Sequence, residues 1–410
     1  MPEAPASGTR WHGNKSGSMT DKRPLPSTDP SQAPPMAPQI VRKSIGTPDE
    51  RVARAGTFTR LMRRPEAGVV LGLIATIIIF ALLPGAESLY SLQGAMTFLT
   101  LSAELGILAA AVSLLIIAGE FDLSIGSMVG FAGIVIGLLV TNLHWPLWAA
   151  IGSAFAVAVV VGYLNGLITV RTRLPSFIVT LASLFILRGL SIGITRAVTG
   201  RTQIPYILDN PPDPWTAAIF NGHMFTGLFH WMGAQGWIAT KANGDPFVPG
   251  IPMSIVWWLV ITALAGWVLT QTRFGNWIYA SGGDAVVARN VGVPVKRVKI
   301  TLFITTAMAA TLLATIQVME AGSADTVRGT QKEFEAIIAA VIGGVLLTGG
   351  YGTVLGAAFG ALIFGLVQMG IFYTGIDTDW FKVFLGLVIL AAVLVNNYGR
   401  ARALGERVES

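Results

Sequence analysis

The sequence predicts an all-α polytopic membrane protein with about ten transmembrane helices, and three observations support this prediction. Of the 410 residues, 53% are hydrophobic and only 12% are charged, whereas soluble proteins carry about 25% charged residues. The mean hydropathy is +0.64. The apolar residues also gather in runs of about 20, which is the helix length that spans a bilayer core.

Ten apolar runs follow residue 65, and five runs in each half of the chain predict an inverted 5+5 arrangement by parity. The run 336–349 is short and precedes a group of glycines, so a broken or re-entrant helix is the alternative to a complete crossing. The expected spans are 66–84, 98–118, 126–142, 148–170, 175–195, 254–271, 300–320, 336–349, 353–373 and 380–397.

The regions around these spans differ in composition. Residues 1–65 hold ten of the 21 prolines and show no apolar periodicity, which predicts a disordered cytoplasmic tail; a docking segment is the alternative. Residues 66–399 form the transmembrane domain, with an outer loop at 196–253 and a cytoplasmic loop at 272–299. Residues 400–410 form a second cytoplasmic tail.

Basic residues are distributed unequally between the loops. With both termini in the cytoplasm, the cytoplasmic segments carry 21 of the 28 Lys and Arg residues and the outer segments carry six. Because basic residues accumulate on the cytoplasmic side of membrane proteins, we expect both termini there. This placement also explains the net charge of +6 without nucleic acid as a partner.

The composition argues against several kinds of chemistry. The chain has no Cys and four His, and none of these His lies in a metal-ligand spacing. We find no Walker motif and no nucleophile–base cluster, so we expect no metal, no cofactor and no catalytic residue.

The most informative stretch lies in the cytoplasmic loop. Asp284 is expected to be the N-cap of a short helix that ends near Asn290. A turn at the preceding glycines and a stop after it complete the pattern. Such a helix suits contact with a soluble motor, and an ordinary connecting loop is the alternative. The candidate contact residues are Gly282, Gly283, Asp284, Ala288, Arg289 and Gly292.

Polar residues inside or between spans are candidates for a substrate path, because a buried carboxylate is costly and usually faces the bundle interior. Glu104 and Gln317 lie within spans, and Arg188 is a possible charge partner of Glu104. Asp122 and Ser124 lie between two spans, where the alternative is a turn capped by the Ser124 and Ser127 hydroxyls.

A glycine-rich segment separates two apolar spans near residue 350. Gly343, Gly344, Gly349, Gly350 and Gly352 suggest a phosphate-binding loop at first sight. The stretch lacks the Gly-Lys-Ser/Thr ending of such loops, so close helix packing is the favoured interpretation.

Four ordered motifs resemble those of the ribose/xylose-type sugar ABC transporter permeases, and the resemblance covers residues 66 to about 400. The motifs are Glu120–Ser127, Pro175–Leu181, the segment 282–293 and the glycines of 343–352. The chain departs from the family at Glu120-Phe121, where Gly-Ile is typical, and at Asp284, where Asn is common.

The resemblance implies a bacterial inner-membrane permease that imports a pentose or hexose. It also implies a second permease copy, cytoplasmic ABC ATPase subunits and a periplasmic sugar-binding protein as partners. A permease for branched-chain amino acids or nucleosides is the closest alternative. An ion-coupled secondary transporter and an intramembrane enzyme fit less well, because buried carboxylates are few and no catalytic cluster is visible.

Overall fold

The described part of the chain is built almost entirely of helices. The computed structural model describes residues 67–209, 213–375 and parts of 377–390. The two expected tails and most of the expected span 380–397 lie outside these residues. Four two-residue strands form two antiparallel pairs: β1 (Gln203–Ile204) with β4 (Ala324–Asp325), and β2 (His223–Met224) with β3 (Ile251–Pro252). The predicted all-α class is confirmed.

Nine helices of the described chain correspond to expected spans. They are α2 (Ala67–Leu82), α3 (Leu92–Ile117), α4 (Ile125–Thr141), α5 (Leu147–Thr172), α6 (Ser176–Thr199), α9 (Met253–Gln271), α12 (Val295–Ala321), α13 (Lys332–Ile342) and α14 (Val354–Tyr373). Six of them, α3, α5, α6, α9, α12 and α14, are long and apolar enough to cross a membrane. The 11-residue α13 is about 16 Å long, so it is the broken helix that the glycines indicated.

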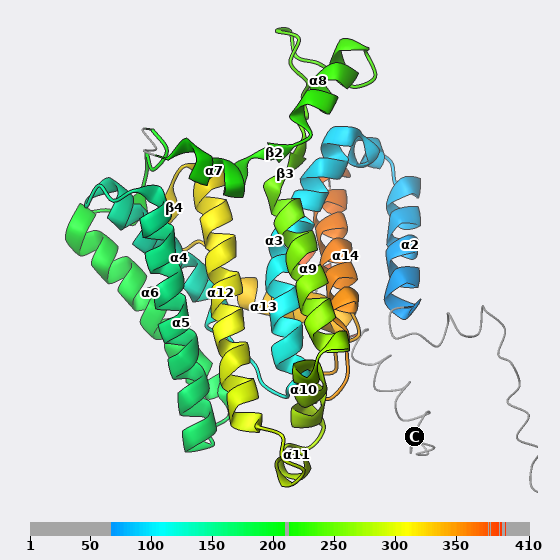
Figure 1. Ribbon diagram of the computed structural model, residues 1–410. Helices are drawn as coiled ribbons and strands as arrows, with labels where there is room; N and C mark the ends of the chain where they lie inside the picture. The colour runs from blue at the N-terminus through cyan, green and yellow to red at the C-terminus, as the bar shows by residue number, and fades with distance from the viewer. Residues whose placement is uncertain are drawn as a thin grey trace, which may run out of the picture. The chain divides into compact units, whose positions relative to one another are not determined.

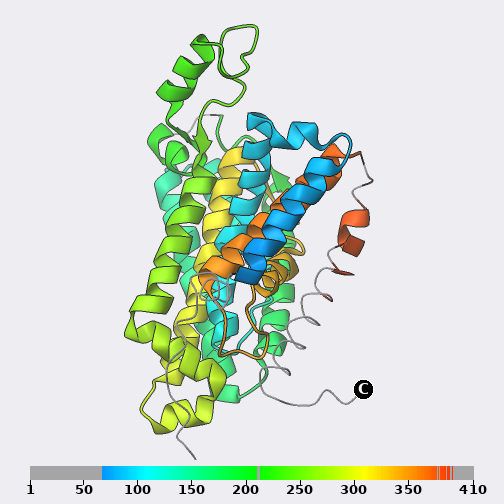
Figure 2. The same cartoon turned by 90° about the vertical axis from the view of Figure 1, so that its right-hand side faces the viewer.

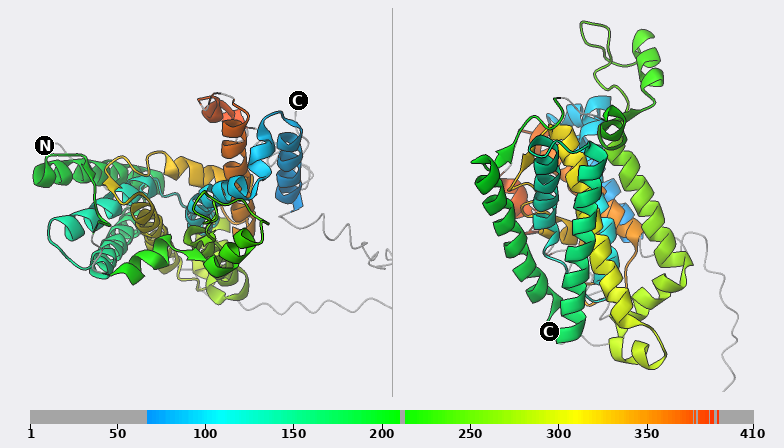
Figure 3. Two further views of the ribbon diagram at one scale, coloured as in Figure 1. Left: turned by 90° about the horizontal axis from the view of Figure 1, so that it is seen from above. Right: turned by 60° about the vertical axis from the view of Figure 1, so that its left-hand side comes forward.

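The helices α3 and α12 form the centre of the bundle. In their most apolar stretches, 89% and 78% of the residues are buried, against 28% to 33% in α5, α6 and α9. Each central helix ends at a glycine with positive φ, Gly119 (+82°) and Gly322 (+60°), a conformation that glycine adopts without the steric cost of a side chain. The right panel of Figure 3 shows α5 beside α12, and Figure 2 shows α2 lying along α14.

The two halves of the bundle repeat one order of elements. A long central helix, a break, a short helix and another long helix occur as α3–α4–α5 and again as α12–α13–α14. In Figure 1, α3 descends from the end where α8 lies, whereas α12 ascends from α11. The packing is also reciprocal, because α5 lies on α12 and α14 lies on α3. This order agrees with the inverted arrangement of the two halves.

The long loops carry short helices at opposite ends of the bundle (Figure 1). The expected outer loop contains α7 (Pro214–Asn221) and α8 (Thr226–Ala234), and the expected cytoplasmic loop contains α10 (Arg273–Gly283) and α11 (Ala285–Asn290). A 3-10 helix, η2 (Ala86–Tyr90), precedes α3. The segment 272–299 is therefore more helical than expected.

Candidate path and coupling sites

Glu104 and Gln317 meet between the two central helices. The Gln317 Nε2 atom donates a hydrogen bond of 2.6 Å to Glu104 Oε2. Arg328 Nη1 stabilises the end of α12 by donating hydrogen bonds to the Gln317 and Ser323 carbonyl oxygens, both at 2.8 Å. The expected pairing of Glu104 with Arg188 is wrong, because Arg188 interacts electrostatically with Glu333 instead. The sequence does not reveal how α6 is rotated, and this rotation decides which side chain Arg188 meets.

Glu104 also lines a cavity of about 460 Å³ at the end of the bundle where β2 and β3 lie. The cavity walls come from α3, the end of α12 and the segment 247–252, and they include a second carboxylate, Glu320. Hydroxyl, amide and imidazole groups complete the polar lining, from Gln93, Thr97, Thr100 and His223. Sequence reasoning missed Glu320, although it lies one turn after Gln317, which was a candidate.

Asp122 and Ser124 lie elsewhere, in a buried network where α4 begins. Asp122 Oδ1 accepts hydrogen bonds from Ser124 N at 2.9 Å and Ser124 Oγ at 2.6 Å, and its Oδ2 accepts one from Thr306 Oγ1 at 2.6 Å. Ser124 Oγ accepts a further bond from Asn165 Nδ2 at 3.0 Å. The network joins the α3–α4 turn to α5 and α12. It lies apart from the cavity that Glu104 lines.

The capping interaction expected of Ser124 is wrong in detail. The Ser124 side chain makes no cap hydrogen bond with α4, and its hydroxyl donates to Asp122 instead. The backbone of this turn is also held by α6, because Ser176 Oγ accepts from Phe121 N and Thr180 Oγ1 accepts from Leu123 N, both at 3.0 Å. The turn is therefore fixed from three neighbouring helices.

The short helix α11 forms as expected. Asp284 Oδ1 accepts hydrogen bonds from Val286 N at 2.8 Å and Val287 N at 2.9 Å, and these bonds hold the pKa of its carboxyl group below the usual value. Gly292, with φ of +88°, ends the segment. Ala288 is buried, and the Arg289 Nε atom donates to the Ala285 carbonyl oxygen of its own helix at 3.0 Å.

The expected turn at Gly282 and Gly283 is wrong, because both residues belong to the last turn of α10. Gly282 is required for close packing: a Cβ atom there would lie 1.8 Å from the Ile117 carbonyl oxygen and 2.7 Å from Gly350 N. Gly283 has open space at the same position. The sequence cannot separate these two adjacent glycines, because only the tertiary contact with α3 distinguishes them.

The break glycines complete this contact, which we call the glycine junction (Gly119, Gly282, Gly349 and Gly350). Gly350 N donates to the Ile117 carbonyl oxygen at 2.8 Å, and a Cβ atom on Gly349 would lie 2.9 Å from the Gly119 Cα atom. Of the other expected break residues, Gly344 and Gly352 have positive φ, and Gly343 packs against Gly356. The expectation of close packing is therefore confirmed for this segment.

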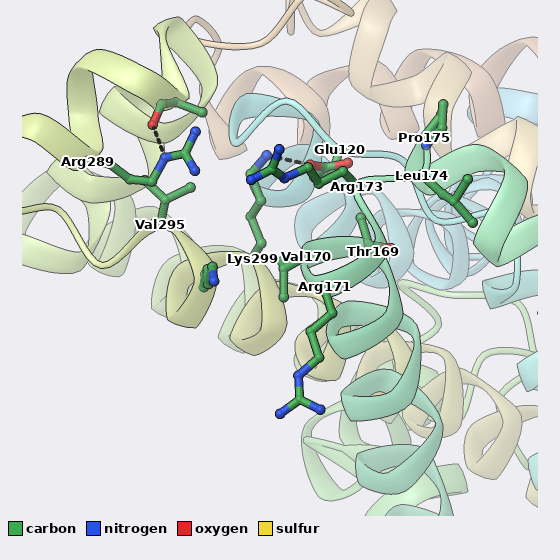
Figure 4. A pocket seen from close by; sticks show the side chains of 12 residues that line it. Glu120, Thr169, Val170, Arg171, Arg173, Leu174, Pro175, Arg289, Val295 and Lys299 are labelled. Atoms are coloured by element: carbon green, nitrogen blue, oxygen red, sulfur yellow. Dashed lines mark hydrogen bonds and ion pairs between the residues drawn. The ribbon is translucent and has the colours of Figure 1, made fainter. Parts of the chain in front are cut away.

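A second cavity, of about 580 Å³, lies at the α11 end of the bundle (Figure 4). We call it the basic cavity, because five cationic side chains line it: Arg171, Arg173, Arg289, Lys296 and Lys299. Glu120 is the one acidic residue of its lining, and its carboxylate pairs with the Lys299 ammonium group. Glu120 is one of the three residues that depart from the family pattern, with Phe121 and Asp284.

No group of three His, Cys, Asp or Glu residues able to hold a metal ion is found among the residues that the structure describes. The polar sites present hydroxyl, amide, imidazole, carboxylate and cationic groups, which can bind a polar solute or a charged partner.

Comparisons with known proteins place the chain among transport proteins. A family model described as "Branched-chain amino acid transport system / permease component" matches residues 94–393. The ribose import permease protein RbsC of Escherichia coli K12 is 29% identical over 341 residues, which are 83% of this chain and 96% of that protein. The xylose transport system permease protein XylH of the same strain is 29% identical over 82% of this chain and 92% of that protein.

A third relative, the inner membrane ABC transporter permease protein YjfF of Escherichia coli K12, is 30% identical over 71% of this chain and 80% of that protein. The family model covers well over half of the chain, and these relatives align over most of their own length. They agree with the resemblance that the four sequence motifs indicated. The chain therefore belongs to the permease-component family of ABC transporters that this model describes.

Proposed function

We propose that this chain is the membrane-spanning permease subunit of an ATP-driven importer for a pentose or hexose. One observation carries the choice of substrate: relatives named for ribose and xylose align over more than 80% of this chain and more than 90% of their own length. The cavity beside Glu104 supports it, because carboxylates, amides and hydroxyls are groups that hydrogen-bond sugar hydroxyls.

A branched-chain amino acid is the second candidate, because the family description names that substrate. The experiment is uptake of labelled ribose, xylose and leucine by cells that carry or lack the gene. We expect deletion to abolish uptake of a sugar, with leucine uptake unchanged and sugar uptake restored by the intact gene. Loss of leucine uptake with both sugars unaffected would reject the sugar assignment.

The path residues follow from the same proposal. Glu104 is assigned to the solute path because it lines the cavity, and Gln317 is assigned with it because its amide donates a hydrogen bond to the Glu104 carboxylate. Asp122 and Ser124, our other two candidates, would act on the path indirectly, by fixing where α4 begins. Replacing Glu104 with Gln keeps the shape and removes the charge, so we expect a raised KM for sugar uptake with the protein level unchanged.

The α11 segment is assigned as the contact with the ATPase. Val286, Val287 and Val291 expose apolar side chains on it, and such a cluster is typical of a protein-binding surface. The glycine junction connects α10 to the ends of α3 and of the α13–α14 break. A displacement of α11 would therefore reach both halves of the bundle through backbone contacts.

The coupling assignment predicts a selective defect. Replacing Arg289 with Glu should leave membrane insertion intact and abolish sugar-stimulated ATP hydrolysis in proteoliposomes that contain the whole transporter. Lys241→Glu, in the loop at the opposite end, is the matched control and should retain stimulation. Full stimulation and copurification of the ATPase with Arg289→Glu would move the contact elsewhere, first to Arg171–Leu174.

Orientation and assembly complete the proposal. The bias of basic residues supports both termini in the cytoplasm, with residues 1–65 as a tail outside the transmembrane domain. Reporter fusions after Arg173, Lys296 and Arg402 should read cytoplasmic, and a fusion after Lys241 should read periplasmic. Two permease copies are expected to form the transporter with ATPase subunits and a periplasmic binding protein, and the mass of the purified complex measures this stoichiometry.

A further inference from the structure

The basic cavity carries more positive charge than its own residues neutralise. Of the five cations that line it, Lys299 is paired with Glu120, the one carboxylate of the lining. The Lys299 and Glu120 side chains are only 15% and 13% exposed, so this pair lies at the inner wall. Cations gathered in a concave site repel one another, and an anion entering the site relieves that repulsion.

The cations come from both walls of the cavity. Arg171 and Arg173 lie at the end of α5 and beyond it, whereas Lys296 and Lys299 lie in the first turns of α12. Figure 4 shows Arg173 turned toward the Glu120–Lys299 pair, Arg171 pointing away from it, and Arg289 turned back to its own helix. A ligand held between the walls would therefore meet guanidinium and ammonium groups from two helices, which suits phosphate oxygens.

An apolar face leads along α5 to this cavity. Val160, Leu164 and Ile168 follow one another at helical spacing, and all three are exposed, at 56%, 46% and 42%. Arg171 continues the same face by one turn and lines the cavity. Leu174, on the cavity lining, is 48% exposed. Apolar side chains below a cationic pocket fit a molecule with acyl chains and an anionic headgroup.

We propose that the basic cavity is a binding site for the phosphate headgroup of an anionic phospholipid in the leaflet on the α11 side. Arg173, Lys296 and Lys299 hold the phosphate oxygens, and Arg171 guides the headgroup from the mouth of the cavity. The lipid would join the α5–α6 turn to the start of α12. This inference does not depend on the transported solute, because none of these residues lines the cavity beside Glu104.

The test is native mass spectrometry of the purified full chain in detergent, titrated with phosphatidylglycerol or phosphatidylcholine. We expect phosphatidylglycerol to bind about tenfold more tightly. The Arg173→Gln/Lys296→Gln variant should lose that preference, because each basic group near a lipid surface contributes about a few-fold to binding. The matched control is Arg196→Gln/Arg201→Gln, two exposed arginines at the opposite end of α6, and it should keep the preference.

Three results would overturn the proposal. The first is equal binding of the two lipids, and the second is an equal loss of preference in the control variant. The third is displacement of the bound lipid by inorganic phosphate or a Glu-rich peptide at matched concentration, which would assign the cavity to a free anion or an acidic protein. The melting temperature of each variant is measured in parallel, and Arg173→Gln alone replaces the double variant if that one is unfolded.

Discussion

Two junctions between helices, α3–α4 and α13–α14, are stabilised in contrasting ways. At the first, the Asp122 and Ser124 side-chain oxygens accept hydrogen bonds from the backbone of the turn, from the Asn165 amide of α5 and from the Thr306 hydroxyl of α12. At the second, Gly349 and Gly350 remove side chains so that backbone meets backbone at Gly119 and Gly282. The first junction therefore depends on side-chain hydrogen bonds, and the second depends on the absence of side-chain atoms at the glycines.

Because of this difference, the two junctions should respond differently to substitution. A hydrogen-bonded junction loses stability in steps, one donor at a time, because each unsatisfied buried group adds its own cost. A backbone contact has no intermediate state, because a Cβ atom either fits or forces the helices apart. We expect the largest effects of substitution at the glycine junction and graded effects around Asp122.

The strongest test compares two adjacent glycines. Gly282→Ala would place a Cβ atom 1.8 Å from the Ile117 carbonyl oxygen, whereas Gly283→Ala meets nothing within 4 Å. We expect Gly282→Ala to lower the free energy of unfolding by about 3 kcal/mol or more. Gly283→Ala should be neutral or stabilising by up to about 1 kcal/mol, because alanine favours a helix. Thermal unfolding in detergent measures both variants, and equal melting temperatures would show that close packing does not stabilise this junction.

The next test removes the acceptor at the hydrogen-bonded junction. Asp122→Ala leaves Ser124 N and Ser124 Oγ without the oxygen that they contact, whereas the Thr306 hydroxyl keeps the Phe303 carbonyl oxygen as an acceptor. Buried donors left unsatisfied cost about 1–3 kcal/mol each, so we expect a loss of about 3 kcal/mol after partial relaxation. Asp209→Ala, at an exposed aspartate, is the control and should change stability by less than about 0.5 kcal/mol. A loss at Asp122 as small as that of the control would mean that the network contributes nothing.

A smaller effect comes from removing one donor. Thr306→Val deletes the hydroxyl that donates to Asp122 Oδ2 and should cost about 1 kcal/mol. Thr305→Val is the matched control, since the Thr305 hydroxyl donates within its own helix, to the Thr301 carbonyl oxygen. Combining Thr306→Val with Asp122→Ala should give less than the sum of the two losses, because both remove the same bond. Additive losses would show that the two residues act independently.

Local features of this molecule could be predicted from the sequence, and tertiary ones could not. The membrane spans could be predicted from the lengths of the apolar runs. The Asp284 cap could be predicted because it involves only Asp284 and the backbone amides of the residues that follow it. The partner of Glu104 depends on how the helices are rotated about their axes. The sequence alone therefore could not show that the partner is Gln317 and not Arg188. The lining of the basic cavity comes from residue 120 and from the segments 169–175 and 285–299. The sequence showed only that basic residues cluster in the last two of these segments.

The α10–α11 junction sharpens the comparison, because it is a hydrogen-bonded junction like that of Asp122 but exposed to solvent. Asp284 Oδ1 accepts from the Val286 and Val287 amides, and solvent can replace these bonds. Loss of the cap should therefore open α11 locally and leave the melting temperature of the whole protein unchanged. Hydrogen exchange at the Val286 and Val287 amides is the measurement, with Asp284→Ala expected to lose protection at neutral pH.

The same cap predicts a pH dependence with a definite sign. The pKa of Asp284 is lower in the folded helix than in the unfolded chain, because the carboxylate accepts two backbone hydrogen bonds. Its stabilising effect is therefore complete above the unfolded pKa of about 3.9 and is lost as the pH falls through the lower folded pKa. Protection of the two amides, corrected for intrinsic exchange, should decrease on acidification in the native chain. Asp284→Asn caps a helix without titrating, so its protection should stay constant over the same range. A parallel decrease in Asp284→Asn would show that another group controls the opening of α11, and the exposed junction would then differ from the buried one in mechanism as well as in strength.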